Sequence, residues 1–144
     1  MAVASLTITT LSVTFSPSNA MQCISSSNAA PEGSEILHGP IGAYLISKLC
    51  GVKDEALLDA IREHTIGGLQ MSLLSKCLFV ADAIEDGRDY PGVDVAREIA
   101  TKNIDDAVFY LLKHTLEFLL EKEVSIFPKT IEVYNHYLKQ RKGE

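Results

Sequence analysis

Apolar residues recur at three- and four-residue spacing through most of this chain, and this periodicity constrains the fold more strongly than any other feature. Residues at that spacing line one face of an α-helix. Asp54, Ser72 and Asn103 each stand directly before such a run, where their side chains suit a helix N-terminus. Pro128 stands at a similar boundary and is typical of a first helical position. The sequence therefore predicts an all-α fold.

The predicted helices are separated by segments of turn or extended character. Gly51 is typical of a residue that ends a helix, residues 86–92 form a turn-rich loop, and residues 124–127 form an extended connector. Strand-like alternation of any length occurs only at residues 5–15. The expected helices span about residues 36–49, 54–64, 72–85, 93–101, 103–120 and 128–139.

Composition divides the chain into two parts. Residues 1–33 are rich in Ser, Thr and Ala and contain no Lys or Arg, because the first basic residue is Lys48. We expect residues 1–33 to be a disordered or atypical leader and residues 34–144 to form one helical domain. The sequence Ser18-Asn19-Ala20 resembles a signal-peptidase site, but the positively charged start of a secretory signal is missing.

Charge, hydropathy and cysteine content limit the classes of function. The net charge is −6, which argues against nucleic-acid binding. No stretch is long and apolar enough to span a bilayer, so no membrane partner is expected. Cys23, Cys50 and Cys77 form no CxxC motif and are expected to be reduced thiols. These features favour a cytoplasmic protein.

Three polar residues stand where a metal site is conceivable. Asp82 lies within a very apolar run, where a buried carboxylate costs several kcal/mol unless something pairs with it. His64 ends a predicted helix, and His38 precedes Gly39-Pro40. Imidazole and carboxylate are common metal ligands. The alternative is a pair of hydrogen-bonded core histidines and an Asp that forms a salt bridge with a nearby Arg.

Three blocks of sequence carry a family resemblance: LHGPIGAYL from Leu37, AIREHT from Ala60, and ADAIEDGRDYPGV from Ala81. Together they resemble the YqeK family of HD-domain phosphohydrolases, which are symmetrical diadenosine tetraphosphate hydrolases that release two ADP. The resemblance extends over about residues 34–138. It implies an HD-domain-like helical bundle that binds iron or another divalent metal and takes a dinucleoside polyphosphate or ADP as its ligand.

The resemblance also implies roles for individual residues. Asp82 matches a metal ligand, and His38 and His64 match catalytic-site histidines that contact phosphate or hold a further metal. Thr65 would touch the nucleotide. Arg88 would hold phosphate through its planar guanidinium, unless a salt bridge to Asp82 or to a neighbouring Glu is its only role. The family's nucleotide-contacting connector corresponds to Ser125, Ile126, Phe127, Pro128, Lys129 and Thr130.

One part of the family pattern has no counterpart. Family members carry an early His and a His-Asp dipeptide, whereas this chain has no His before His38 and no His-Asp pair. We therefore expect a bundle that lacks the usual N-terminal helices, with exposed apolar surface and a possible homodimer. An alternative function stays open, namely a catalytically inactive, truncated helical module that binds a nucleotide or a partner chain.

Overall fold

The structure is a computed structural model that describes residues 34–143. Most of these residues are helical. The predicted all-α fold is confirmed for this part of the chain. The predictions for residues 1–33, including the alternating pattern at 5–15, lie outside the described residues. The helices are α3 (Ser34–Cys50), α4 (Glu55–Glu63), α5 (Leu73–Ile84), α6 (Val93–Lys102), α7 (Ile104–Glu121) and α8 (Pro128–Lys142).

The predicted N-caps form the expected hydrogen bonds. The Asp54 carboxylate accepts from the Leu57 amide at 3.2 Å at the start of α4. The Ser72 hydroxyl accepts from the Ser75 amide at 3.1 Å at the start of α5. Asn103 accepts from the first amides of α7, with 2.8 Å between its Oδ1 and the Asp105 nitrogen. Each cap satisfies a helix amide that has no partner within its own helix.

The predicted end agrees with the structure for α3 but not for α8. Gly51 follows α3 with a φ of +67°, a left-handed conformation that suits glycine and confirms the predicted stop. The last helix was expected to end near Lys139 but continues to Lys142. Gly143 then stops it with a φ of +72°, and Lys139, Arg141 and Lys142 lie in its last turn.

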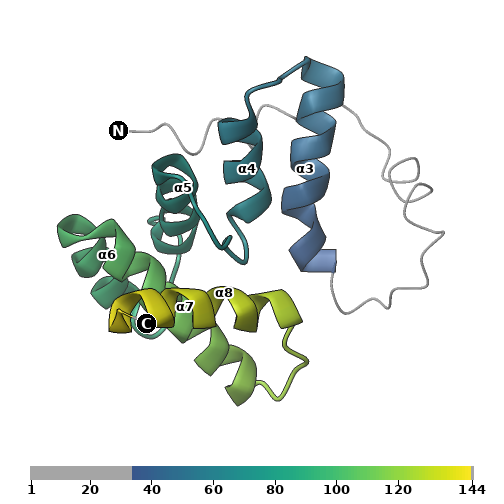
Figure 1. Ribbon diagram of the computed structural model, residues 1–144. Helices are drawn as coiled ribbons and strands as arrows, with labels where there is room; N and C mark the ends of the chain where they lie inside the picture. The colour runs from purple at the N-terminus through teal and green to yellow at the C-terminus, as the bar shows by residue number, and fades with distance from the viewer. Residues whose placement is uncertain (1–33, 144) are drawn as a thin grey trace. The chain divides into compact units, whose positions relative to one another are not determined.

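The core lies on the buried faces of α5, α7 and α8. Helix α7 packs against α5, α6 and α8, and α4 packs against α5. Figure 1 shows α8 running across α7. The central buried side chains are Phe79, Val80, Val108, Leu111, Leu112, Val133 and Tyr137. Helix α7 is therefore the element on which the neighbouring helices are assembled.

Ion pairs fasten two neighbours to the start of α7. Lys76 on α5 lies 2.6 Å from the carboxylate of Asp105. Arg141 on α8 pairs with Asp106, and its guanidinium lies over the Phe109 ring, 4.7 Å from the ring centre. No helix within residues 34–143 combines the length and the apolar composition that a bilayer crossing requires.

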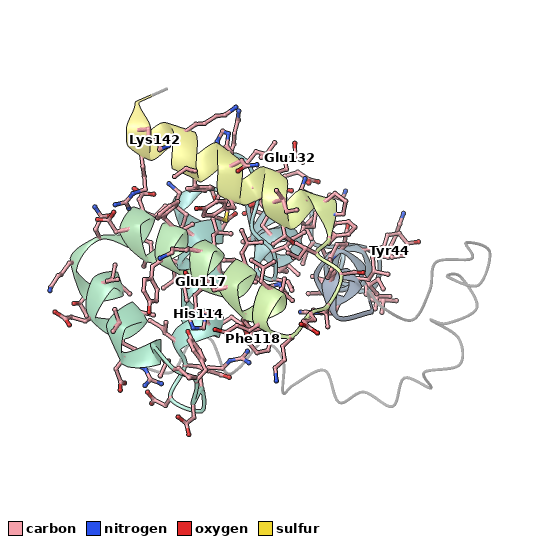
Figure 2. All side chains as sticks on the ribbon, turned by 90° about the horizontal axis from the view of Figure 1, so that it is seen from below. Tyr44, His114, Glu117, Phe118, Glu132 and Lys142 are labelled. Atoms are coloured by element: carbon pink, nitrogen blue, oxygen red, sulfur yellow. The ribbon has the colours of Figure 1, made fainter. Side chains whose placement is uncertain are left out.

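Several large apolar side chains stay exposed among the described residues. Tyr44 on α3 points away from the other helices and is 60% exposed (Figure 2). Phe118, near the end of α7, is 50% exposed and is labelled in the same figure. The expected self-association and homodimer remain predictions.

Burial of Tyr137 predicts a loss of stability at high pH. Burial, together with the charges of Asp105 and Glu63, raises the pKa of Tyr137 to about 12. Its pKa in the unfolded chain is about 10. The native state therefore gains stability from the protonated phenol below pH about 10, and loses it as pH rises toward 12. Denaturant unfolding at a series of alkaline pH values should show a steeper decline for the native chain than for Tyr137→Phe. Parallel declines would contradict the assignment.

Candidate functional site

Two histidines from different helices meet at the ring nitrogens. His38 lies in α3 and His64 follows α4, and their Nε2 atoms are 2.8 Å apart. The ring centres are 4.7 Å apart and the rings are inclined by 69°. The Nδ1 of His64 lies 2.7 Å from the Ile61 carbonyl, which can only accept, so Nδ1 carries the hydrogen. In a neutral His64 ring the Nε2 then accepts a hydrogen bond that His38 donates.

Thr65 completes this cluster. Its hydroxyl oxygen lies 3.1 Å from Nε2 of His38 and 3.4 Å from Nε2 of His64. The structure thus brings together three residues to which the resemblance gives neighbouring roles. Because a hydroxyl both donates and accepts, Thr65 can follow a change in which ring nitrogen carries a proton.

The absence of a side chain at Gly39 permits the contact between the two histidines. A Cβ placed on Gly39 would lie 2.8 Å from the Ile61 carbonyl oxygen, closer than real Cβ atoms approach backbone oxygen. The same Ile61 carbonyl accepts a hydrogen bond from Nδ1 of His64. Helix α3 and the end of α4 therefore meet at this carbonyl.

Asp82 is less buried than its apolar surroundings in the sequence suggest. Its side chain is 38% exposed, because Phe79 and Val80 occupy the core face of α5 and Asp82 lies beside that face. The Asp82 carboxylate lies 3.2 Å from Nη2 of Arg88. The expected buried acid is therefore wrong, and its partner is the cation that the salt-bridge alternative named.

Arg88 also closes the end of α5. Its Nε donates to the Asp82 carbonyl at 3.0 Å and lies 3.3 Å from the carboxylate of Glu85. Both ion pairs considered from the sequence are thus present. The Arg88 side chain is still 45% exposed, so part of its guanidinium faces solvent.

Other side chains bind the carbonyls that α5 leaves without partners. The Tyr90 hydroxyl donates to the Ala83 carbonyl at 3.0 Å. Arg97, from α6, donates to the Ile84 carbonyl at 3.1 Å and to the Glu85 carbonyl at 2.9 Å. The last four carbonyls of a helix find no amide donor within the helix, so these side chains donate the hydrogen bonds that are missing.

Helix α7 holds the far end of the same loop. His114, labelled in Figure 2, donates from Nε2 to the Pro91 carbonyl at 2.8 Å. The Tyr110 hydroxyl donates to the Gly92 carbonyl at 3.2 Å. Gly92 has a φ of +94°, and a Cβ there would lie 2.5 Å from the Tyr110 oxygen, so this contact also requires glycine.

Burial raises the pKa of Tyr90, and the neighbouring Tyr110 raises it further, against the opposing effect of Arg88 and Arg97. The raised pKa extends to higher pH the range in which the Tyr90 hydroxyl is protonated and can donate to the Ala83 carbonyl. Sequence reasoning did not single out Arg97, Tyr90 or Tyr110. Their contacts reach across the loop, and no local motif marks them.

The connector residues lie before and within the first turn of α8. Phe127 precedes α8 and is 46% exposed, whereas Thr130 is buried and its amide donates to the Phe127 carbonyl. Ser125, Pro128 and Lys129 are exposed, and Ile126 is partly buried. The implied nucleotide contacts of this connector stay predictions.

The described residues do not make a complete metal centre. No group of three or more His, Cys, Asp or Glu side chains within residues 34–143 is arranged to hold a metal ion. His38, His64 and Asp82 therefore do not form the three-ligand set that the sequence left conceivable. The converging nitrogens of His38 and His64 alone fall short of the four-ligand or six-ligand shells typical of protein metal sites.

Comparison with known proteins identifies the family. The HD-domain model matches residues 18–87, a range that includes His38, His64 and Asp82. A symmetrical bis(5'-nucleosyl)-tetraphosphatase of Bacillus subtilis is 46% identical over 101 residues, 70% of this chain and 54% of that protein. The match and the identity place this part of the chain in the HD-domain family. The family resemblance read from the sequence is thus confirmed.

Further relatives of this HD-domain protein carry the same name. The symmetrical bis(5'-nucleosyl)-tetraphosphatase of Halalkalibacterium halodurans is 44% identical over 76% of this chain and 59% of its own. That of Staphylococcus aureus is 42% identical over 73% of this chain and 55% of its own. The HD-domain protein thus spans little more than half the length of the curated relatives it matches.

A solved structure supports the HD-domain fold. A Clostridium acetobutylicum protein, described as a predicted HD superfamily hydrolase involved in NAD metabolism, superposes with a TM-score of 0.73 at 33% identity. The match covers 85% of this chain and 66% of that one.

Gly39 and Gly42 offer a matched pair of variants on one helix. Gly39→Ala should destabilise the fold by ~1–3 kcal/mol, because its methyl group would force α3 away from Ile61. Gly42→Ala should be neutral or stabilising by up to ~1 kcal/mol, because its methyl group would lie at an ordinary contact distance of 3.7 Å and Ala favours helix. Denaturant unfolding measures both. Equal midpoints for the two variants would refute the close approach at Gly39.

Proposed function

We propose that this HD-domain protein hydrolyses dinucleoside tetraphosphates symmetrically to two nucleoside diphosphates, with diadenosine tetraphosphate as the reference substrate. The proposal is carried by the identity of 42–46% to three proteins that bear the name of this activity. The HD-domain match over the residues of the histidine cluster and Asp82 supports it.

Arg88 is the residue we assign to the phosphate chain. Its ion pairs with Asp82 and Glu85 join side chains that are 38% to 59% exposed, and such pairs contribute less than about 1 kcal/mol. A polyphosphate carries several negative charges and offers paired oxygens to the planar guanidinium. The phosphate chain can therefore replace these carboxylates as the partner of Arg88.

The cluster of His38, His64 and Thr65 is the second group that we assign to the substrate. The Nε2 atoms of His38 and His64 and the Thr65 hydroxyl converge within 3.4 Å of one another. His38 and Thr65 can donate hydrogen bonds to oxygens of one phosphoryl group, while His64, whose Nε2 accepts in the neutral ring, orients His38. Donors fixed before the substrate arrives stabilise charge that develops on phosphoryl oxygens during the reaction.

HD-domain phosphohydrolases generally bind divalent metals, and iron is the metal that we propose here. The side chains of residues 34–143 do not fit a complete metal centre, so no step of the reaction is assigned to a metal. The proposal assigns roles only to the histidine cluster, Asp82 and Arg88. A cytoplasmic location and the lack of nucleic-acid binding stay predictions.

Product analysis tests the reaction directly. The purified chain would be incubated with diadenosine tetraphosphate and Fe²⁺, Mn²⁺ or a chelator, and the nucleotides separated by ion-exchange chromatography. We expect two ADP for each substrate consumed, and loss of activity with the chelator. Equal amounts of ATP and AMP, or no turnover with either metal, would refute the proposal.

Substitution of Arg88 tests its role. Arg88→Gln should raise KM for diadenosine tetraphosphate about 10- to 100-fold, since hydrogen bonds to charged groups contribute ~1.5–3 kcal/mol. Lys113→Gln is the matched control, because Lys113 is an exposed cation paired with an acid on its own helix, Glu117, at 3.3 Å. The control should keep the KM of the unmodified chain. A similar KM for both variants would remove Arg88 from the site.

A further inference from the structure

One guanidinium from α6 holds the turn that carries Arg88. Arg97 donates from Nε to the Ile84 carbonyl at 3.1 Å, and from Nη2 to the carbonyls of Glu85 at 2.9 Å and Arg88 at 3.1 Å. Its Nη1 donates to the carboxylate of Asp94 at 2.9 Å. Arg97 therefore joins the last residue of α5 to the backbone of Arg88.

Hydrogen bonds, rather than packing, define the shape of this turn. The Arg88 amide donates to the Glu85 carbonyl at 2.9 Å, and that carbonyl also accepts from Arg97. Between them, Asp86 and Gly87 are exposed, and a Cβ on Gly87 would meet nothing within 4 Å. Without the Arg97 bonds, residues 85–88 would be held by the Arg88 amide and by the contacts of the Arg88 side chain with Asp82 and Glu85.

The position of the Arg88 backbone decides where its guanidinium can lie. The Arg88 side chain extends back to Asp82, while the Arg88 carbonyl accepts from Arg97. A displacement of about 1 Å in a positioning group can cost up to about 10²-fold in rate. The turn must therefore be fixed if Arg88 is to meet a phosphate chain in one geometry.

We propose that Arg97 is a positioning residue of the nucleotide site, which holds residues 85–88 in the conformation that presents Arg88 to the phosphate chain. This inference rests on the proposed function. Arg97 acts through Arg88 and not by contact with the nucleotide, because four of its hydrogen bonds already go to the protein.

Arg97→Lys is the informative variant. Lysine keeps the charge but has a compact ammonium that cannot reproduce the fork reaching three carbonyls. Two controls lie on the same helix. Asp94→Asn removes only the carboxylate partner of Arg97, and Lys102→Gln removes a cation whose partner is Glu98, at 2.6 Å.

Three readouts separate positioning from general stability. Amide hydrogen exchange by mass spectrometry should accelerate in peptides covering residues 85–90 of Arg97→Lys, and stay unchanged in peptides from α7. The dissociation constant for ADP and the KM for diadenosine tetraphosphate should both rise about tenfold, within the range that misplacement of a binding group produces. Neither control should change these values by more than about twofold.

A double-mutant cycle with Arg88→Gln decides whether Arg97 acts through Arg88. If it does, Arg97→Lys should weaken ADP binding in the native chain but have no further effect once Arg88 is Gln. An undiminished effect in that background would overturn the inference. So would unchanged exchange at residues 85–90, or faster exchange there with unaltered ADP affinity. A native chain that binds ADP without cleaving the substrate would refute the proposed reaction, and the ADP cycle would still decide the role of Arg97.

Discussion

The carbonyl groups at the end of α5 are the constraint on which the candidate site depends. A helix leaves its last carbonyls without partners inside the helix, so their donors must come from elsewhere in the chain. Here Arg88, Tyr90 and Arg97 supply side-chain donors to successive carbonyls from Asp82 to Glu85. The same bonds that end the helix therefore fix the turn, so helix termination and site geometry have one physical cause.

Side chains of the core helix α7 hold the loop between α5 and α6 in place. Helix α7 is packed on three sides and contributes His114 and Tyr110, which bind the carbonyls of Pro91 and Gly92. Helix α6 begins at the end of this loop and contributes Arg97 to its other side. An exposed arginine thus stands on backbone that is held from two helices, which favours a defined orientation without burial of the charge.

The sequence predicts those structural features that depend on contacts between residues close together in the chain. The caps at Asp54, Ser72 and Asn103 were predictable because each binds amides two or three residues away. The role of Arg97 was not, because the carbonyls that accept from it lie 9 to 13 positions earlier in the chain. The exposure of Asp82 was misjudged because the apolar run around it is only partly buried: Phe79 and Val80 face the core, whereas Leu73 and Leu74 are exposed. Family resemblance implies roles for His38, His64 and Arg88 that spacing alone leaves open.

The central claim is that the histidine cluster and the Arg88 turn serve one nucleotide. The most direct measurement is a titration of the ¹⁵N-labelled chain with ADP, followed by the chemical shifts of assigned backbone amides. We predict that the largest changes occur together at Thr65 and Arg88, with the same apparent dissociation constant. Changes confined to one of the two, or centred elsewhere while both stay unperturbed, would contradict the account.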